Sequence, residues 1–346
     1  MPTFPMLAIA RTAGNPVIGE NIVTFLWQGK EPVTLIEDLH NWEEYPQPMV
    51  KAASGLWLVT LQLPPDGYLE YAFLDPKTGK RVPDPLNPRK VWNGIDAYNH
   101  YFYMPKAAPS PLVELAKGIP RGTVTRHEVQ TREYVVGAKR TVYLYQPPVK
   151  DPVPLVIVYD GPDYLRRGKL NVIVDNLIAE NHIHPFGMAM VQNGGRARSL
   201  EYACAEATLS FLFECVIPLA QEHLVLTPPG GEPYGVIGAS MGALMAMYTG
   251  LRLPRIFGKV LSQAGSFGVP EYEFVVMDLV RYGPRLDLQV WMDAGRFDSL
   301  LESNRDMYAL LKEKCYTAKY NEFSGGHNYT SWRNDLWRGL EVLFKK

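Results

Sequence analysis

Cysteine is scarce in this sequence: only three occur in 346 residues, Cys204, Cys215 and Cys315. None of them belongs to a C-x-x-C pair or another metal-ligand spacing, and an odd number argues against a disulfide framework. The first residues also lack the basic leader of a secretory signal. We therefore expect a cytoplasmic protein with reduced thiols.

The net charge is almost zero, because 35 Lys and Arg residues balance 36 Asp and Glu residues and leave a formal charge of −1. This balance removes the usual electrostatic basis for binding nucleic acid or an anionic membrane. No apolar run approaches the ~20 residues that a membrane-spanning helix needs. The expected partner is therefore a small molecule, with no nucleic acid and no membrane.

Cofactor motifs are missing as well. The sequence contains no H-E-x-x-H motif, no P-loop and no convincing dinucleotide fingerprint, so we expect neither a metal nor an organic cofactor. His182 and His184 stand close together, but Asn181 and Pro185 flank them, and we interpret both histidines as loop residues.

The first part of the chain predicts a small all-β domain over residues 1–107. Apolar and polar residues alternate there in short runs separated by turn residues, which is typical of strands packed in a sandwich. The predicted strands cover residues 21–27, 32–36, 55–63 and 68–74. A proline-rich stretch, 108–121, predicts a linker.

Residues 122–346 have a different pattern, in which near-continuous apolar runs alternate with helical stretches. Such alternation predicts an α/β domain with a mostly parallel sheet covered by helices. A hairpin of residues 123–130 and 140–145 comes first. The predicted inner strands are 155–159, 188–191, 234–237, 259–262 and 288–292, and the predicted helices are 172–179, 206–222, 241–251, 300–314 and 332–344.

One short motif indicates a catalytic residue. Gly238-Ala-Ser-Met-Gly242 fits the pattern G-x-S-x-G, with a predicted strand before it and a predicted helix after it. In that context the pattern indicates a nucleophile elbow, where a strained turn exposes the hydroxyl of Ser240 at the start of a helix. The alternative is a glycine-rich turn whose serine only caps the helix.

A serine nucleophile needs a base, and His327 is the only one of 7 histidines downstream of Ser240. In α/β-hydrolases the chain order is Ser, then Asp or Glu, then His. His327 follows a glycine-rich loop before the last predicted helix, which agrees with a catalytic role. The alternative is an ordinary histidine of a surface loop.

Four carboxylates are candidates for the acid partner of the histidine: Asp287, Asp293, Asp298 and Glu302. We favour Asp298, because it lies in the loop after the predicted strand 288–292, where the acid of such a triad projects. Asp298 has an alternative role as a helix N-cap. Asp293, at the end of the strand, has an alternative role in anchoring the turn.

An oxyanion hole needs backbone N–H groups where negative charge develops. The amide of Met241, directly after the serine, is the first expected donor. The second is expected from the loop 160–164, where Pro162 has no N–H, so that Gly161 or Asp163 remains, and we prefer Gly161.

Arg196 and Arg198 follow another predicted strand in the loop 192–199. Two interpretations remain open for them: they orient an anionic or polyphenolic substrate, or they pair with Glu201 and neighbouring acids.

Residues spread over the second domain resemble the enterochelin-esterase-like family, also called the esterase D-like family. The resemblance implies an α/β-hydrolase with Ser240 as nucleophile, Asp298 as acid and His327 as base. Arg196, Arg198 and Trp332 are candidate substrate-binding residues. The resemblance rests on Asp160-Gly161, 196–201, 238–242, 295–298, Asn304 and 325–328 with Trp332.

The first domain resembles the early-set immunoglobulin-like domain related to family-48 carbohydrate-binding modules. The matching stretches are 41–42, 55–57, 70–73 and 83–88. Trp42, Trp57 and Trp92 are candidates for stacking on sugars, whereas core packing is the alternative for Trp57 and Phe73. The stretch 37–42 departs from the pattern of the family, which argues against a recognition role for this domain.

Together these features predict a serine esterase that hydrolyses a carboxylic ester through an acyl-enzyme. A siderophore ester of the enterochelin type is the preferred substrate, because the sequence lacks a secretion signal. The alternatives are a carbohydrate-linked acyl ester of the feruloyl or acetyl type, or a catalytically silent glycan-binding protein.

Overall fold

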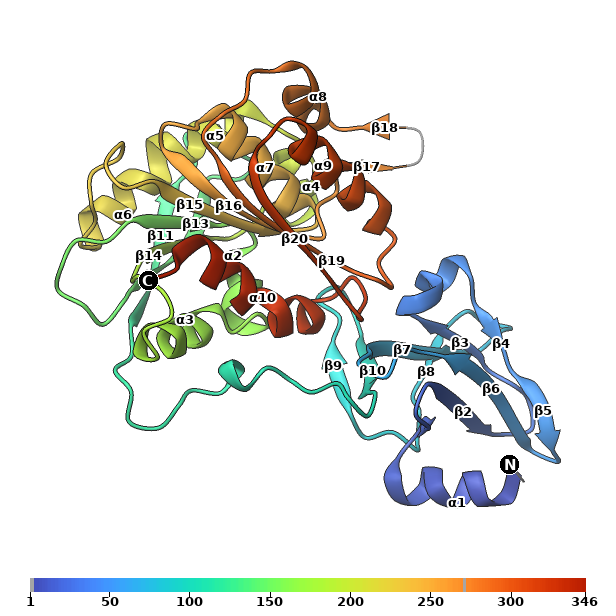
Figure 1. Cartoon of the computed structure of the whole chain (residues 1–346). Coiled ribbons are helices and arrows are strands. Elements are labelled where there is room, and N and C mark those ends of the chain that lie inside the picture. The colour runs from blue at the N-terminus through green and yellow to red at the C-terminus, as the bar shows by residue number, and fades with distance from the viewer. Residues whose placement is uncertain (1–2, 270–271) are drawn as a thin grey trace. The chain divides into compact units, whose positions relative to one another are not determined.

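A computed structural model describes residues 3–269 and 272–346 and divides the chain into two compact units (Figure 1). Unit 1 holds the N-terminal segment up to Pro109 together with two later segments, Gly295–Ser299 and Phe323–Ser331. Unit 2 holds Ser110–Ala294, Leu300–Glu322 and Trp332–Lys346. The chain therefore returns twice from unit 2 to unit 1.

Unit 1 is built on two antiparallel sheets, as the alternating pattern predicts. The first sheet has the strand order β1 (Val17–Ile18), β2 (Ile22–Gln28), β6 (Leu56–Gln62), β5 (Val50–Ala53). The second has the order β4 (Gln47–Pro48), β3 (Thr34–Glu37), β7 (Tyr68–Leu74), β10 (Tyr98–Tyr103), β9 (Lys90–Trp92), and β8 (Arg81–Val82) also pairs with β7. The four predicted strands are confirmed as β2, β3, β6 and β7.

The core of unit 1 is aromatic. Phe25 from one sheet meets Tyr71 and Phe102 from the other in edge-on ring contacts. Phe73 is fully buried and Trp57 packs against this core, so both have the structural role that was the alternative to sugar binding. Burying such rings stabilises a sandwich of this size, since each aromatic side chain removes roughly 150–250 Å² from water.

Helix α1 (Thr3–Ala13) was not predicted. It is held by a small apolar cluster in which Ala10 packs with Leu26 and Leu56. Sequence periodicity did not reveal it, because the segment is short, contains Pro5 and is stabilised by tertiary packing rather than by its own propensity.

Unit 2 contains one sheet with the order β11 (Thr123–Gln130), β12 (Lys139–Gln146), β14 (Gly187–Val191), β13 (Leu155–Val158), β15 (Tyr234–Ala239), β16 (Phe257–Gln263), β19 (Gln289–Gly295), β20 (Thr317–Phe323). The hairpin β11–β12 is antiparallel and pairs antiparallel with β14. From β14 to β19 all neighbours are parallel. This is the mostly parallel sheet that the apolar runs predict.

Helices cover both faces of this sheet (Figure 1). Val260 and Met292 point to the face packed by α7 (Met241–Arg252), α8 (Val275–Tyr282) and α9 (Leu301–Glu313). Leu261 and Trp291, one residue along each strand, contact Gly339 of α10 (Tyr329–Phe344) on the other face. Strands with apolar side chains on both faces are what a covered parallel sheet requires.

The remaining elements are short. They include helices α2 (Gly161–Arg166), α3 (Leu170–Ala179), α4 (Arg198–Tyr202), α5 (Glu206–Phe211) and α6 (Ile217–His223), a π-helical turn (Leu212–Val216) between the last two, and the hairpin β17 (Gly268–Val269) and β18 (Tyr272–Glu273). The predicted helix 206–222 is thus confirmed as α5, the π turn and α6. Within the described residues no single helix is long and apolar enough to cross a bilayer, although the bent pair Gly195–Tyr202 and Glu206–His223 passes that test jointly.

Candidate active site

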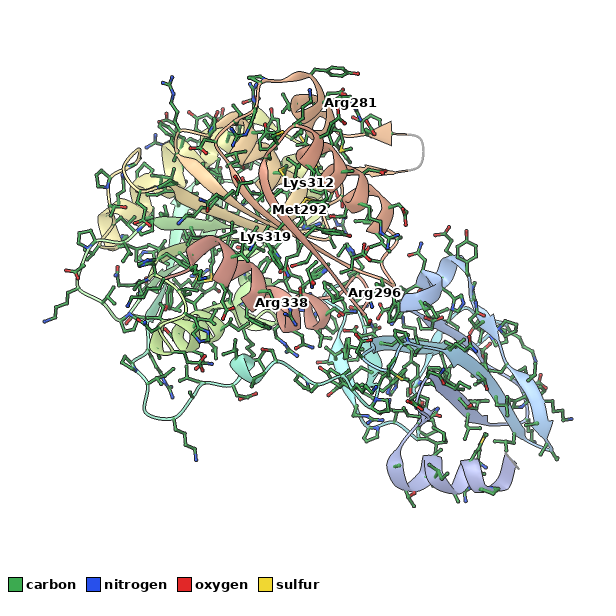
Figure 2. All side chains as sticks on the ribbon, viewed as in Figure 1. Arg281, Met292, Arg296, Lys312, Lys319 and Arg338 are labelled. Atoms are coloured by element: carbon green, nitrogen blue, oxygen red, sulfur yellow. The ribbon has the colours of Figure 1, made fainter. Side chains whose placement is uncertain are left out.

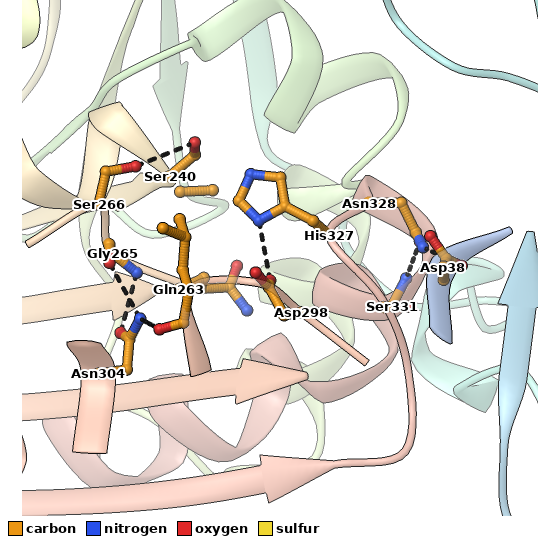
Figure 3. Close-up of polar contacts among 12 residues, drawn as sticks. Asp38, Ser240, Gln263, Gly265, Ser266, Asp298, Asn304, His327, Asn328 and Ser331 are labelled. Carbon is orange, nitrogen blue, oxygen red and sulfur yellow. Dashed lines mark hydrogen bonds and ion pairs between the residues drawn. The ribbon is translucent and has the colours of Figure 1, made fainter. Parts of the chain in front are cut away.

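Ser240 stands in a strained turn between β15 and α7. Its backbone has φ 58° and ψ −126°, and α7 begins at the next residue, Met241. A positive φ is unusual for a residue with a side chain and marks the strain of a nucleophile elbow. The side chain of Ser240 makes no capping hydrogen bond to the helix, so the helix-cap alternative does not hold. Its Oγ lies 3.5 Å from the Oγ of Ser266 (Figure 3).

The two glycines of the motif are required by close backbone approach. A Cβ at position 238 would overlap the carbonyl group of Gly242. A Cβ at position 242 would come within 3.0 Å of Oδ2 of Asp160 and close to the Cβ of Tyr159. Larger residues at these positions would therefore push the helix away from the strand and change the turn that presents Ser240.

Asp298 and His327 form a hydrogen-bonded pair inside unit 1 (Figure 3). Oδ2 of Asp298 lies 2.8 Å from Nδ1 of His327. The side chain of Asp298 is fully buried, whereas that of His327 is 34% exposed. A carboxylate bound to Nδ1 keeps the proton on that nitrogen and leaves Nε2 to accept another, which is the state that a general base needs.

Asp298 does not cap a helix, because the N-cap of α9 is Leu300. The other candidate acids have different roles. Asp293 is fully buried and accepts hydrogen bonds from Nε1 of Trp291 at 2.9 Å and from Nε2 of Gln263 at 3.1 Å, so it ties β19 to β16. Asp287 is exposed before β19, and the exposed Glu302 pairs with Arg305 at 2.7 Å.

The loop after β13 begins with Asp160 in the left-handed conformation, φ 52°, and α2 follows at Gly161. A Cβ at position 161 would overlap the backbone of Met190, so only glycine lets this loop pass so close to β14. As the first residue of a helix, Gly161 has an amide without an intrahelical acceptor, and Met241 in α7 is placed in the same way.

Arg198 supports this loop. Its guanidinium binds the buried carboxylate of Asp160 with two short contacts, Nε to Oδ1 at 2.8 Å and Nη2 to Oδ2 at 2.6 Å. Asn193 donates to the same carboxylate at 2.6 Å. Of the two open interpretations, pairing with a neighbouring acid describes Arg198, but the acid is Asp160, not Glu201. A bidentate pair with a buried carboxylate fixes the direction of the loop.

Glu201 has another partner, because its carboxylate binds Arg140 at 2.8 Å in a pair that is almost fully buried. Arg196, by contrast, is exposed in the short helical turn Gly195–Ala197. Trp332 is 4% exposed, and its carbonyl accepts a hydrogen bond from Gln263 at 3.1 Å. The indole of Trp332 therefore offers little surface to a ligand.

Two buried amides near Ser240 were not assigned a role from the sequence. Asn304 of α9 exchanges two hydrogen bonds of 2.9 Å with the backbone of Gly265 and so fixes the loop after β16. Gln263, at the end of β16, accepts from the hydroxyl of Tyr164 at 3.1 Å. Burial raises the pKa of Tyr164 well above its usual value, and the charges of Asp293 and Asp160 add to this, so the hydroxyl stays protonated and donates. Only the pairing of distant segments reveals these roles.

In the part of the chain that the structure describes, no three His, Cys, Asp or Glu side chains gather as a metal site. His182 lies on the surface, with Nδ1 2.6 Å from Oε1 of Glu341. The three cysteines are free thiols.

Known proteins match both the sequence and the fold. A family model described as "Putative esterase" matches residues 134–343, more than half of the chain. The chain is 25% identical to an iron(III) enterobactin esterase from Dickeya dadantii over 284 residues, 76% of this chain and 65% of that protein. It is 23% identical to an iron(III) enterobactin esterase from Escherichia coli strain K12, over 93% of this chain and 91% of that protein.

A solved structure of ferric enterobactin esterase from Salmonella typhimurium superposes with a TM-score of 0.82 at 21% identity, and the match covers 97% of this chain and 98% of that one. At this identity the likeness shows a shared fold, that of an α/β-hydrolase. The strained serine turn, the family match and these relatives all indicate an ester hydrolase. The chain is an enterobactin-esterase-like member of the putative esterase family, whose enzyme class is carboxylic-ester hydrolase.

Proposed function

We propose that this protein is a serine esterase in which Ser240, His327 and Asp298 act as a triad. Ser240 Oγ attacks the carbonyl carbon of an ester while Nε2 of His327 takes its proton. Asp298 stabilises the imidazolium that forms. The alcohol leaves with the proton from His327, and a water molecule, deprotonated by the same imidazole, then releases the acid from Ser240.

The amides of Met241 and Gly161 are the proposed donors to the oxyanion. Each is the first residue of a helix, α7 or α2, where the N–H group and the helix dipole both favour negative charge. Loss of one such donor lowers kcat about 10²–10³-fold in a serine hydrolase. Arg198 has an indirect role in this scheme, since it holds Asp160, the residue before Gly161.

The hydrogen bond between Asp298 and His327 is the observation that supports the triad best, because it pairs the acid and the base that the sequence favours, whereas the carboxylate of Asp293 accepts from Gln263. The sheet order supports it further. β15 and β19 both run parallel to β16, so Ser240 and the segment of Asp298 follow the carboxyl ends of parallel strands. The proposal requires Nε2 of His327 to reach Ser240 Oγ in the working enzyme.

The proposed substrate is a siderophore ester of the enterobactin type. The enterobactin esterase of Salmonella typhimurium matches along almost the whole chain, including the N-terminal sandwich. Exposed Arg196, in the loop after β14, is a candidate to bind the anionic catecholates of such a substrate. A feruloyl or acetyl ester of a carbohydrate is the alternative.

Hydrolysis of p-nitrophenyl acetate tests the nucleophile. Ser240→Ala is expected to lower kcat on the order of 10⁶-fold, to near the background rate. Ser266→Ala is the matched control, because it removes a hydroxyl 3.5 Å from that of Ser240 and is expected to change kcat only a few-fold. Equal rates for wild type and Ser240→Ala would refute the proposal.

The substrate is tested by comparing kcat/KM for ferric enterobactin and for methyl ferulate. A preference for the first supports a siderophore esterase, and a preference for the second supports the alternative. Binding of a glucan without hydrolysis of any ester would instead indicate a silent glycan-binding protein.

We also infer that the sandwich of unit 1 is of the early-set immunoglobulin-like type and that the protein works in the cytoplasm. Two antiparallel sheets over one aromatic core support the first inference. Three free thiols support the second, since reducing compartments preserve them. Fractionation of cells of the source organism tests the location, and recovery in the periplasm or medium would contradict it.

A further inference from the structure

The loop that carries His327, residues 324–328 between β20 and α10, is held inside unit 1 at several points and is called the histidine loop below. Ser324 accepts a hydrogen bond from the backbone N of Tyr68 at 2.9 Å through its carbonyl, and its hydroxyl donates to Asp66 at 2.9 Å. Arg296, labelled in Figure 2, donates to the same hydroxyl at 3.1 Å. The N-terminal side of the histidine loop is therefore tied to the turn before β7.

Asp38 contacts the residues on both sides of His327. Its Oδ2 accepts a hydrogen bond from Nδ2 of Asn328 at 3.2 Å (Figure 3). On the other side, Gly326 lies so close that a Cβ there would overlap the side chain of Asp38. One carboxylate of the sandwich thus fixes positions 326 and 328.

The carboxylate of Asp38 is itself rigidly held. It is 2% exposed, and Oδ2 also accepts from the backbone N of Glu70 at 2.8 Å, whereas Oδ1 accepts from Nε1 of Trp42 at 3.1 Å. Burial raises the pKa of Asp38 well above its usual value, and the charges of Glu70 and Glu37 raise it further. An acid in such surroundings is costly to bury, and its donors are what offset that cost.

Asn328 links Asp38 to the first turn of the last helix, α10. Its Oδ1 accepts from the backbone N of Ser331 at 2.9 Å, in the first turn of α10, while its Nδ2 donates to Asp38. The segment that carries Asp298 is also anchored in unit 1. Its neighbour Phe297 packs in the aromatic core, and the backbone N–H of Phe297 donates to the carbonyl of Gly325 at 3.1 Å.

We propose that Asp38 is a positioning residue of the esterase, which holds the loop around His327 so that its Nδ1–H stays directed at Asp298. The inference rests on the proposed function, because it assigns a role in hydrolysis to a residue of the N-terminal sandwich. Misplacing a catalytic group by about 1 Å costs as much as 10²-fold in rate. The sandwich is in this way part of the catalytic apparatus, whether or not it binds a ligand.

Asn328→Asp tests this directly. The variant keeps the shape and the oxygen that accepts from Ser331, but it replaces the donor that faces Asp38 by a second carboxylate. Asn15→Asp is the matched control. Asn15 is also buried in the sandwich, its Oδ1 accepts from the backbone N of Leu26 at 3.0 Å, and its Nδ2 donates to a carboxylate, Asp84 Oδ2 at 2.7 Å.

Two measurements separate positioning from loss of stability. For p-nitrophenyl acetate, Asn328→Asp is expected to lower kcat 10- to 100-fold with KM within twofold, while Asn15→Asp changes kcat less than twofold even at an equal loss of Tm. In proton NMR, the downfield Nδ1–H signal, assigned by its loss in His327→Gln, is expected to shift or broaden in Asn328→Asp and to persist in Asn15→Asp.

Wild-type kcat and an unchanged Nδ1–H signal in Asn328→Asp would overturn the proposal, as would equal loss of kcat in both variants. If Asn328→Asp does not fold, Asn328→Ala removes the donor without adding a charge and is judged by the same two measurements. Hydrolysis that survives Ser240→Ala would refute the proposed function separately. The NMR comparison does not depend on Ser240, so the two failures are distinguishable.

Discussion

Asp298 and Asp293 stand five residues apart, and exchanging each for asparagine distinguishes the acid of the proposed triad from a structural carboxylate. In Asp298→Asn the new amide group faces Nδ1 of His327 across the 2.8 Å contact. An amide N–H there stabilises the tautomer with the proton on Nε2, which cannot take the proton of Ser240. In a serine protease the same change lowers kcat about 10⁴-fold, which corresponds to about 5 kcal/mol in the activation barrier.

Asp293→Asn is expected to act on stability instead. Its Oδ2 accepts from both Trp291 Nε1 and Gln263 Nε2 inside the sheet, so asparagine can keep that oxygen, but it places a buried amide donor where Oδ1 stood. Leaving one buried donor unsatisfied costs roughly 1–3 kcal/mol, while kcat stays within a few-fold of wild type.

The assay is kcat for p-nitrophenyl acetate, measured at one pH together with Tm for both variants. The reasoning is refuted if Asp298→Asn keeps more than a tenth of the wild-type kcat while folded. It is equally refuted if Asp293→Asn loses as much kcat as Asp298→Asn.

Two further predictions concern unit 2. Glu201→Gln leaves Arg140 buried without a charged partner, so the free energy of unfolding is expected to fall by about 3–5 kcal/mol; urea unfolding measures it, and a loss under 1 kcal/mol would contradict the importance of this pair. Burial raises the pKa of the Cys204 thiol to about 12, so at pH 8 almost no thiolate is present there. Iodoacetamide is therefore expected to label exposed Cys315 in the native protein and Cys204 only after denaturation, as peptide mass spectrometry would report; fast native labelling of Cys204 would be the contrary result.

The elements of both units followed from local patterns. Period-two alternation located β2, β3, β6 and β7, and continuous apolar runs located the parallel strands from β13 to β19. These predictions succeeded because a strand in a covered sheet must be apolar on both faces, and a strand of a sandwich on one. The same patterns did not predict α1, because its stability comes from contacts with Leu26 and Leu56.

Some features of the site also followed from local sequence, and others did not. The turn at Ser240 could be predicted because its glycines, its strand and its helix are neighbours in sequence. The partner of Arg198 was not, since Asp160 lies 38 residues away and competed with the nearer Glu201. The choice of Asp298 over Asp293 rested on its position in the loop after the strand, and in the structure Asp298 bonds His327 whereas Asp293 bonds Trp291 and Gln263.

The sequence by itself therefore determined the two kinds of domain, the serine turn and the set of residues able to serve as acid and base. Only the tertiary structure decided that the segments of Asp298 and His327 join the N-terminal sandwich in one compact unit. The bond from Asn328 to Asp38 spans 290 residues. No periodicity encodes such a contact, because it depends on where folding brings two loops together and on the exclusion of water from the carboxylate between them.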